Sequence, residues 1–192
     1  MPPLILASSS SYRRALLERL GLPFSCHSPN IDETPQHGES ADALALRLAQ
    51  QKAAAVAEYY KEGLVIGSDQ VCVNGNQLLG KPGTTDNARR QLLAASGKTV
   101  TFYTGLCVHD CATGRQTSVV EPFRVHFRRL TESQIDRYLE KEPALDCAGA
   151  FKCEGLGISL FERMDGRDPN SLVGLPLIAL IDLLAEFGAE VP

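Results

Sequence analysis

The fold is indicated near the beginning of the chain, by the stretch Leu4-Ile5-Leu6-Ala7-Ser8-Ser9-Ser10-Ser11-Tyr12-Arg13-Arg14. Its four apolar residues predict a short buried strand. The residues after the serines have the apolar spacing of an amphipathic helix, which we expect to continue to Leu20 and to be ended by Gly21 and Pro23. A strand that leads directly into a helix is typical of α/β proteins.

The remaining sequence continues this alternation, which we read from apolar periodicity and from turn and capping residues. Strands are expected over Leu64–Val73, Gln77–Leu79, Thr99–His109 and Gln116–Arg128, and helices from Ser40 to Tyr60, from Thr84 or Thr85 to Gly97, from Thr131 to Lys141 and from Leu177 to Phe187. Gly67-Ser68-Asp69-Gln70 is expected to interrupt the first strand, and Asp165–Pro176 to form a loop. The predicted class is α/β with a mixed sheet.

Composition and charge limit the classes of protein to consider. The chain has 192 residues, of which 44% are hydrophobic and 22% charged, which favours a globular protein. The net charge of −4 and the lack of a polybasic block argue against nucleic-acid binding but allow a small nucleotide as partner. No apolar run reaches the roughly 20 residues of a membrane span. We therefore expect no membrane association, a cytoplasmic location and reduced cysteines.

The serine-rich turn is the first candidate site. A helix N-terminus offers free backbone N–H groups and partial positive charge, and an arginine can make forked bonds to phosphate oxygens. The glycines of a P-loop are missing, which also argues against a kinase or ligase. A plain helix cap with solvated arginines explains the local pattern equally well.

Asp69 is the second candidate, because it lies between Leu64-Val65-Ile66 and Val71-Cys72-Val73. A carboxylate in so apolar a run is costly unless it is paired or binds a metal. We favour a functional role, as a base that deprotonates water or as a ligand of a divalent cation, over a strand that ends at Gly67.

Several further charged residues carry weaker signals. Lys52 lies on a predicted helix, where a solvated lysine is the simpler interpretation. Lys81 lies in a constrained turn between Gly80 and Pro82, and the adjacent acids Asp32-Glu33 lie in a polar loop. Lys152-Cys153-Glu154 lies in a glycine-rich segment and fits a pocket lining and an exposed turn equally well.

Together these segments resemble the Maf-like family of nucleoside triphosphate pyrophosphatases. The matching segments are Leu4–Ser8 with Arg13 and Leu16-Leu17, Asp32-Glu33, Lys52-Ala53, Ile66–Asp69, Gly80-Lys81-Pro82, Ala148–Phe151 and Asn170–Pro176. The resemblance implies an elongated central mixed sheet flanked by helices, with two lobes around a cleft, as a single domain over residues 1–192. It also implies hydrolysis of a nucleotide to its monophosphate and pyrophosphate with a divalent cation such as Mg²⁺, Mn²⁺ or Co²⁺.

The resemblance also assigns roles to individual residues. Asp69 matches the base for the attacking water, and Glu33 matches an acid near the metal and phosphates, so Glu33 and Asp69 are the expected metal ligands. The positions that match phosphate-binding residues are Ser8, Arg13, Lys52 and Lys81. The sequence departs from the family at Ser11, where many members have proline; this loosens the turn but removes no functional group.

Tyr12, Gln70 and Glu154 occupy the positions that sort substrate subclasses, and this combination resembles the 7-methyl-GTP pyrophosphatases. An aromatic face at Tyr12 attracts the positively charged 7-methylguanine ring, and Glu154 accepts hydrogen bonds from a guanine edge. The alternatives are a dTTP/UTP-type pyrophosphatase and a non-catalytic, nucleotide-binding regulator of septum formation. A homodimer is a possible assembly.

Overall fold

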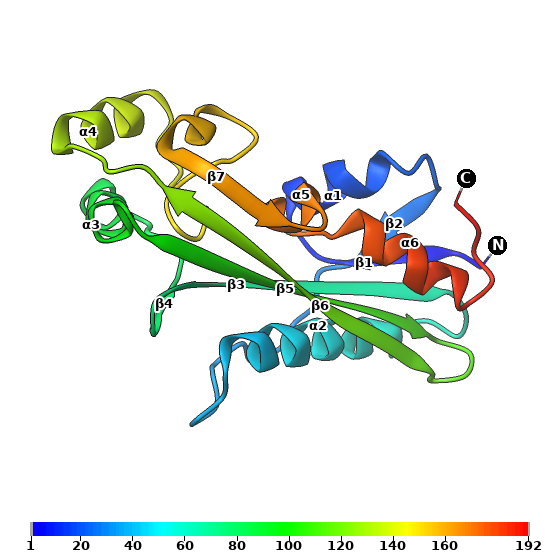
Figure 1. The fold of residues 1–192 in the computed structure, drawn as a ribbon. Helices are drawn as coiled ribbons and strands as arrows, with labels where there is room; N and C mark the ends of the chain where they lie inside the picture. The colour runs from blue at the N-terminus through cyan, green and yellow to red at the C-terminus, as the bar shows by residue number, and fades with distance from the viewer. Residues whose placement is uncertain (1, 192) are drawn as a thin grey trace. The chain divides into compact units, whose positions relative to one another are not determined.

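The computed structural model describes residues 2–191, so the first and last residues of the expected single domain lie outside the described part. Its strands form one mixed seven-stranded sheet in the order β2-β1-β3-β5-β6-β7, with β4 paired to β3. The strands are β1 (Leu4–Ala7), β2 (Phe24–Cys26), β3 (Leu64–Asn74), β4 (Gln77–Leu79), β5 (Thr99–Asp110), β6 (Gln116–Phe127) and β7 (Phe161–Gly166). Helices flank the sheet, which confirms the predicted α/β class (Figure 1).

The helices begin where the sequence supplies capping residues. They are α1 (Ser11–Glu18), α2 (Ala41–Ala57), α3 (Thr85–Ala95), α4 (Glu132–Lys141), α5 (Pro169–Val173) and α6 (Leu177–Ala185), with a 3₁₀ helix η1 over Leu156–Leu160. The side chains of Thr84 and Thr131 accept backbone hydrogen bonds at the starts of α3 and α4, and Gln134 completes the predicted capping box. Ser40 occupies the N-cap position of α2 but makes no side-chain capping bond. None of the helices within residues 2–191 is long and apolar enough to cross a membrane.

The chain divides into two compact units, each built from separate stretches of sequence. Unit 1 contains the residues up to Gln70, Tyr103–Glu121 and the residues from Asp168 onward, and unit 2 contains Val71–Phe102 and Pro122–Arg167. Strands β3, β5 and β6 contribute residues to both units.

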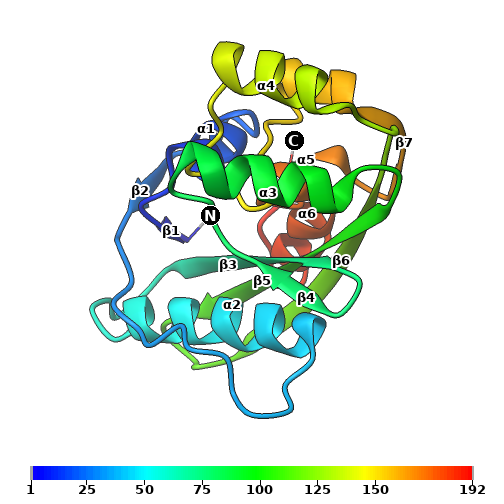
Figure 2. The same cartoon turned by 90° about the vertical axis from the view of Figure 1, so that its left-hand side faces the viewer.

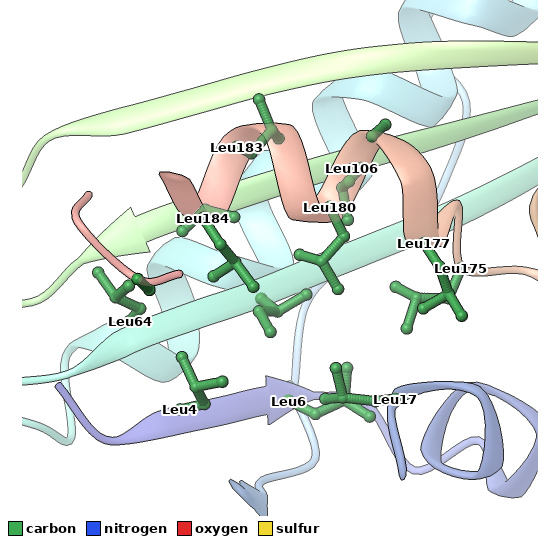
Figure 3. Close-up of a cluster of buried hydrophobic side chains, with 14 of the residues drawn as sticks. Leu4, Leu6, Leu17, Leu64, Leu106, Leu175, Leu177, Leu180, Leu183 and Leu184 are labelled. Atoms are coloured by element: carbon green, nitrogen blue, oxygen red, sulfur yellow. The ribbon is translucent and has the colours of Figure 1, made fainter. Parts of the chain in front are cut away.

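Unit 1 has helices on both faces of its part of the sheet, because successive strand residues point to opposite faces. Strand β1 is parallel to both β2 and β3. Leu4 and Leu6 pack with Leu17 of α1 and with the apolar side of α6 (Figure 3). Ile5 and Ala7 pack on the other face, against the alanines of α2. Both faces of β1 are therefore buried.

Helix α2 lies very close to the sheet because glycine and alanine meet at the contact. A Cβ atom added to Gly67 of β3 would lie 2.2 Å from the carbonyl oxygen of Ala49, and one added to Gly105 of β5 would lie 2.2 Å from that of Ala45. Only glycine fits at such a distance. These two contacts fix the height of α2 above the two strands.

Unit 2 contains the β3–β4 hairpin, the antiparallel pair β6–β7 and two helices, α3 and α4, that lie side by side (Figure 2). The interior of unit 2 contains a cluster of phenylalanine rings in edge-to-face contact. Its members are Phe102, Phe127, Phe151 and Phe161, with neighbouring ring centres 4.8–5.6 Å apart. Phe151 thereby anchors the glycine-rich segment that precedes η1.

Four features differ from the predictions. Strand β3 is not interrupted at Gly67–Gln70, because Ser68, Asp69 and Gln70 find polar partners inside the protein. Strand β2 was missed because it has only three residues, and β7 was missed because most of its residues are exposed and three of the six are charged. Helix α5 forms inside the expected loop, where Asp168 caps its first turn.

Candidate functional site

Asp69 lies just beyond the point where its neighbouring strand ends. Strands β1 and β3 are parallel, and the last residue of β1, Ala7, pairs with Gly67. Beyond this point β1 gives way to the serine turn, whereas β3 continues through Asp69. In α/β sheets, ligands bind beyond the carboxyl ends of the strands, so Asp69 occupies a favourable position for a binding site.

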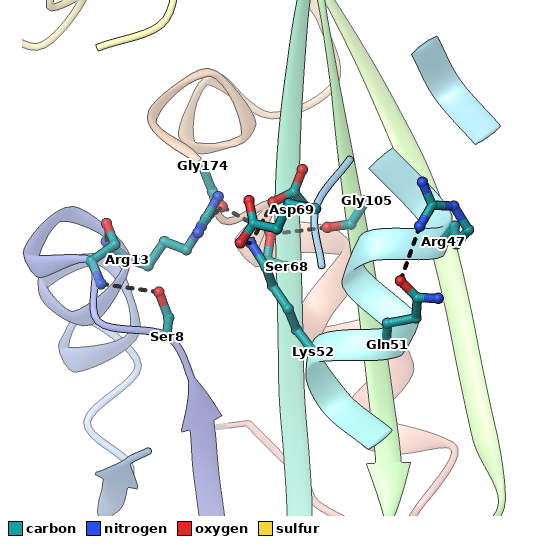
Figure 4. Close-up of polar contacts among 11 residues, drawn as sticks. Ser8, Arg13, Arg47, Gln51, Lys52, Ser68, Asp69, Gly105 and Gly174 are labelled. Atoms are coloured by element: carbon teal, nitrogen blue, oxygen red, sulfur yellow. Dashed lines mark hydrogen bonds and ion pairs between the residues drawn. The ribbon is translucent and has the colours of Figure 1, made fainter. Parts of the chain in front are cut away.

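Lys52 is the main partner of Asp69. Its Nζ lies 2.6 Å from Asp69 Oδ1 (Figure 4). The same atom lies 2.9 Å from Glu33 Oε1. The side chains of Lys52 and Asp69 are only 8% and 10% exposed, whereas that of Glu33 is 57% exposed. The interpretation of Lys52 as a solvated surface lysine is therefore wrong. Helix α2 places its ammonium group, which is buried, between two carboxylates.

Burial and charge act in opposite directions on Asp69. Burial raises the pKa of the Asp69 carboxyl above its usual value, while Lys52 and Arg13 lower it in part. Burial likewise lowers the pKa of the Arg13 guanidinium, and Asp69 and then Glu33 raise it in part. Asp69 is thus a carboxylate with an increased proton affinity among cationic groups, which is the property expected of a general base.

The serine turn places Arg13 beside this cluster. Ser8 is buried and its Oγ accepts a hydrogen bond from the backbone N–H of Ser10, 3.1 Å away. Ser10 in turn caps α1 by accepting from the N–H of Arg13. Arg13 Nε donates to the carbonyl oxygen of Gly174 at 2.8 Å, which holds the guanidinium in place. Arg14 is exposed and pairs with Glu18, so only Arg13 is directed toward Asp69.

The segment Asn170–Pro176 supports the site through its backbone carbonyl groups. The Gly174 carbonyl accepts from Arg13 Nε and from Ser68 Oγ, at 2.8 and 2.9 Å. Gly174 has a φ of 124°, a conformation that favours glycine. Helix α5 therefore ends in a carbonyl that holds a cation of the candidate site.

Asp168 was not predicted, and it fixes this segment. It is buried, with Oδ1 accepting from the Asn170 N–H at 2.8 Å and Oδ2 from the Ile178 N–H at 2.9 Å. One carboxylate thus caps both α5 and the first turn of α6. An aspartate directly before Pro169 is a helix-start signal that could have revealed α5 from the sequence.

Gln70 points to the opposite face of β3 from Asp69, as expected for adjacent strand residues. Its Nε2 donates to the carbonyl oxygens of Ser171 and Leu172, at 2.8 and 3.0 Å, and contacts Thr104 Oγ1 at 3.3 Å. The amide donors of Gln70 are thus used to hold α5. Tyr12 lies in the first turn of α1 and is partly exposed.

Lys81 and Glu154 belong to unit 2, and both are exposed. The segment around Glu154 is held from α4: the Tyr138 hydroxyl accepts from the Lys152 N–H, and Glu142 accepts from the N–H groups of Leu156 and Gly157. Ala150, just before Phe151, has a φ of 64°, a backbone conformation that is costly for a residue with a Cβ. The segment is therefore fixed at both ends.

The carboxylates fit a divalent cation that arrives with other ligands. Within residues 2–191, no group of three or more histidine, cysteine, aspartate or glutamate side chains is arranged to hold a metal ion. Mg²⁺ in phosphate-handling sites is commonly held by one or two carboxylates, with water and substrate phosphates completing the shell. Glu33 and Asp69 provide such a pair, and Lys52 Nζ lies between them.

These features define an α/β protein with a buried carboxylate beyond the end of its first strand, beside the positively charged side chains of Lys52 and Arg13. The sequence matches the Maf-like protein family over residues 3–187, so the chain belongs to this family. Among solved structures it is similar to the Ham1 protein of Staphylococcus aureus, with 13% identity, a TM-score of 0.45, and coverage of 66% of this chain and 72% of that chain.

Proposed function

We propose that this chain hydrolyses nucleoside triphosphates to the monophosphate and pyrophosphate. The observation that carries the proposal is the buried Asp69 carboxylate, whose pKa is raised by burial and which lies beside Lys52 and Arg13. A protein that only binds nucleotides has no use for a carboxylate beside anionic phosphates. Membership of the Maf-like family supports the same class of reaction.

In the proposed mechanism, Asp69 takes a proton from a water molecule as the water oxygen forms a bond to phosphorus. The bond between that phosphorus and the bridging oxygen breaks, and pyrophosphate leaves. Ser8, Arg13, Lys52 and Lys81 bind the phosphates and offset their charge. Glu33 and Asp69 would hold a divalent cation, which neutralises charge on the leaving group when it is bound.

Lys52 changes partners in this scheme. Without a nucleotide its ammonium group is paired with both Glu33 and Asp69. With a triphosphate and a divalent cation bound, Glu33 and Asp69 would hold the cation and the Lys52 ammonium would turn to the phosphate oxygens. Each of these charges thereby has a partner of opposite sign in both states, which limits the cost of burying them.

The experiment that tests this function compares Asp69→Asn with the unmodified protein, using 7-methyl-GTP and Mn²⁺. Loss of a general base lowers kcat by about 10²–10⁴-fold. Asp86→Asn, at an exposed position in the first turn of α3, is the control and should keep full activity. Near-full turnover by Asp69→Asn would exclude the mechanism. Pyrophosphate release that EDTA abolishes would exclude a purely regulatory binding protein.

We further propose 7-methyl-GTP as the substrate class, on the basis of Tyr12 and Glu154. The aromatic ring suits the positively charged base, and the exposed carboxylate accepts hydrogen bonds from a guanine edge. Gln70 acts on base choice indirectly in this proposal, since its amide holds Ser171 and Leu172 of α5. A panel of purified nucleotides tests the assignment, and faster hydrolysis of dTTP or UTP would overturn it.

A further inference from the structure

The loop that carries Glu33 has no regular structure of its own. Within the described part of the chain, His27 to Ser40 form neither helix nor strand. Irregular loops of this length in compact proteins are either functional or disordered, so the interactions that hold this one matter. Glu33 itself contributes one contact, an exposed carboxylate 2.9 Å from Lys52 Nζ.

Arg47 of α2 donates hydrogen bonds to two residues of this loop, Glu39 and Thr34. Its Nε and Nη2 donate to the two carboxylate oxygens of Glu39, at 2.6 and 2.8 Å, in a forked pair. Nη2 also donates to the carbonyl oxygen of Thr34 at 3.1 Å, and Nη1 donates to Gln51 Oε1 at 3.0 Å. The side chains of Arg47 and Glu39 are only 19% and 9% exposed. A forked pair with so little solvent has a defined geometry.

Hydrogen bonds between residues close in sequence connect the part of the loop held by Arg47 to Glu33. Asp32 Oδ1 accepts from the N–H and the hydroxyl of Thr34, at 2.9 and 2.6 Å, and so forms a tight turn around Glu33. The Gln36 N–H donates to Glu39 Oε2 at 3.0 Å. The Thr34 carbonyl held by Arg47 is thus one residue from Glu33, within a turn that fixes the backbone on both sides.

We propose that Arg47 is a positioning residue, which with Glu39 holds the loop so that the Glu33 carboxylate reaches Lys52 and the cation-bound phosphates. This inference rests on the proposed function. All three guanidinium nitrogens of Arg47 donate within the protein, so the residue acts through Glu33 and does not itself bind phosphate. Loss of such supporting contacts typically weakens metal sites by about 10–100-fold.

The test measures the loop directly, by amide hydrogen exchange over residues 30–40 with mass spectrometry. In Arg47→Ala, amide exchange should be faster in this segment and unchanged in α6. Arg47→Lys keeps the charge but not the forked geometry, so its exchange rate should lie between those of Arg47→Ala and the unmodified protein. Glu39→Gln should show the same local increase in exchange, and it replaces Arg47→Ala in the test if that variant does not fold. Arg14→Ala is the control, since it removes another paired arginine at an exposed position. Unchanged exchange over residues 30–40 in both Arg47→Ala and Glu39→Gln would overturn the proposal.

A second measurement distinguishes positioning from general stabilisation. Arg47→Ala should raise KM for the nucleotide with Mn²⁺ by about 10–100-fold and change kcat less. Combined with Glu33→Gln, the same change should add nothing further, because Arg47 acts through Glu33. Fully additive effects would contradict the inference. If the unmodified protein hydrolyses no nucleotide, the proposed function fails, while the exchange data still decide whether the Arg47 fork holds the loop.

Discussion

The ammonium group of Lys52 lies 2.6 Å from Asp69 and bridges this buried carboxylate to Glu33, on a loop. The two acids come from sequence positions 36 residues apart, and the lysine that joins them comes from a helix between the two. Lys52 therefore affects the proton affinity of Asp69 and also links the loop that carries Glu33 to α2.

Replacing Lys52 by methionine should shift the pH dependence of activity. Burial raises the pKa of Asp69 and Lys52 lowers it, so removing the ammonium raises that pKa further. Because the base must be ionised, activity is lost as pH falls, and the loss should begin at a higher pH in the variant. The kcat/KM profile against pH measures this. Lys61→Met, at an exposed position, should leave the profile unchanged; an unmoved acid limb in Lys52→Met would contradict the assignment of Asp69 as the base.

Cation binding should require the nucleotide. Lys52 Nζ already lies between Glu33 and Asp69 and pairs with both, so the free protein should bind Mn²⁺ weakly in electron paramagnetic resonance titrations at pH 8. A non-hydrolysable triphosphate should tighten binding, and Lys52→Gln should tighten it without nucleotide by about tenfold, a difference of roughly 1.4 kcal/mol. Tight Mn²⁺ binding by the unmodified protein alone would show that the cation site lies elsewhere.

Gly67→Ala should destabilise the protein and disturb the site together. The added methyl group would lie 2.2 Å from the Ala49 carbonyl and push α2, with Lys52, away from β3. Overpacking of this kind costs about 1–3 kcal/mol, measurable by urea unfolding, and kcat should fall as well. Gly80→Ala is the matched control, because its Cβ would meet no heavy atom within 4 Å. Equal stabilities of the two variants would mean that α2 can shift freely.

Glu39 should make a contribution to stability that depends on pH. The hydrogen bond from Arg47 lowers the pKa of Glu39 from 4.5 to about 2. The ionised, paired carboxylate therefore stabilises the fold above pH 4.5, and this contribution is lost as pH falls from 4.5 toward 2. Glu39→Gln should be less stable than the unmodified protein at pH 7, with a difference that narrows below pH 4.5. Urea unfolding across this range checks it; a constant difference would rule out the ion pair as the cause.

Glu154→Gln should change substrate preference without changing stability. The side chain is exposed, and the backbone of its segment is held by Tyr138 and Glu142. The amide replaces an acceptor by a group that also donates, which weakens contacts to the donors of a guanine edge. The ratio of kcat/KM for 7-methyl-GTP to that for UTP should fall, while the midpoint of thermal unfolding stays the same. An unchanged ratio would remove Glu154 from the selection of the base.

Much of the fold could be predicted from the sequence because its elements carry local signals. The apolar run Leu4–Ala7, the capping box at Thr131 and the Asn-Gly turn after β3 are each signals confined to a few residues. Strand β2 and helix α5 have too few residues to show a period. Strand β2 forms by pairing with β1, and α5 is capped by Asp168. The apparent break at Gly67–Gln70 misled for a related reason: its polar side chains are satisfied by partners distant in sequence.

The candidate site was only partly predictable for the same reason. An aspartate in an apolar run marks Asp69, because burying a lone carboxylate is costly. Lys52 has no such local mark, since its environment is created by the contact of Gly67 with α2. Arg47 was not singled out, because its bonds to the loop exist only in the folded chain. Asp168 was overlooked although its cap of α5 is a local signal, whereas its bond to the Ile178 N–H depends on the folded chain.

The carbonyl of Gly174 also sets an order of events during synthesis. Chains emerge from the ribosome N-terminus first. The partner of Arg13, the Gly174 carbonyl, is therefore made 161 residues after Arg13 itself. All residues of unit 2 have been translated by Arg167, whereas unit 1 still lacks α5 and α6. In a nascent chain the Arg13 guanidinium therefore lacks the Gly174 carbonyl until α5 has been made, so this part of the candidate site is completed only after unit 2.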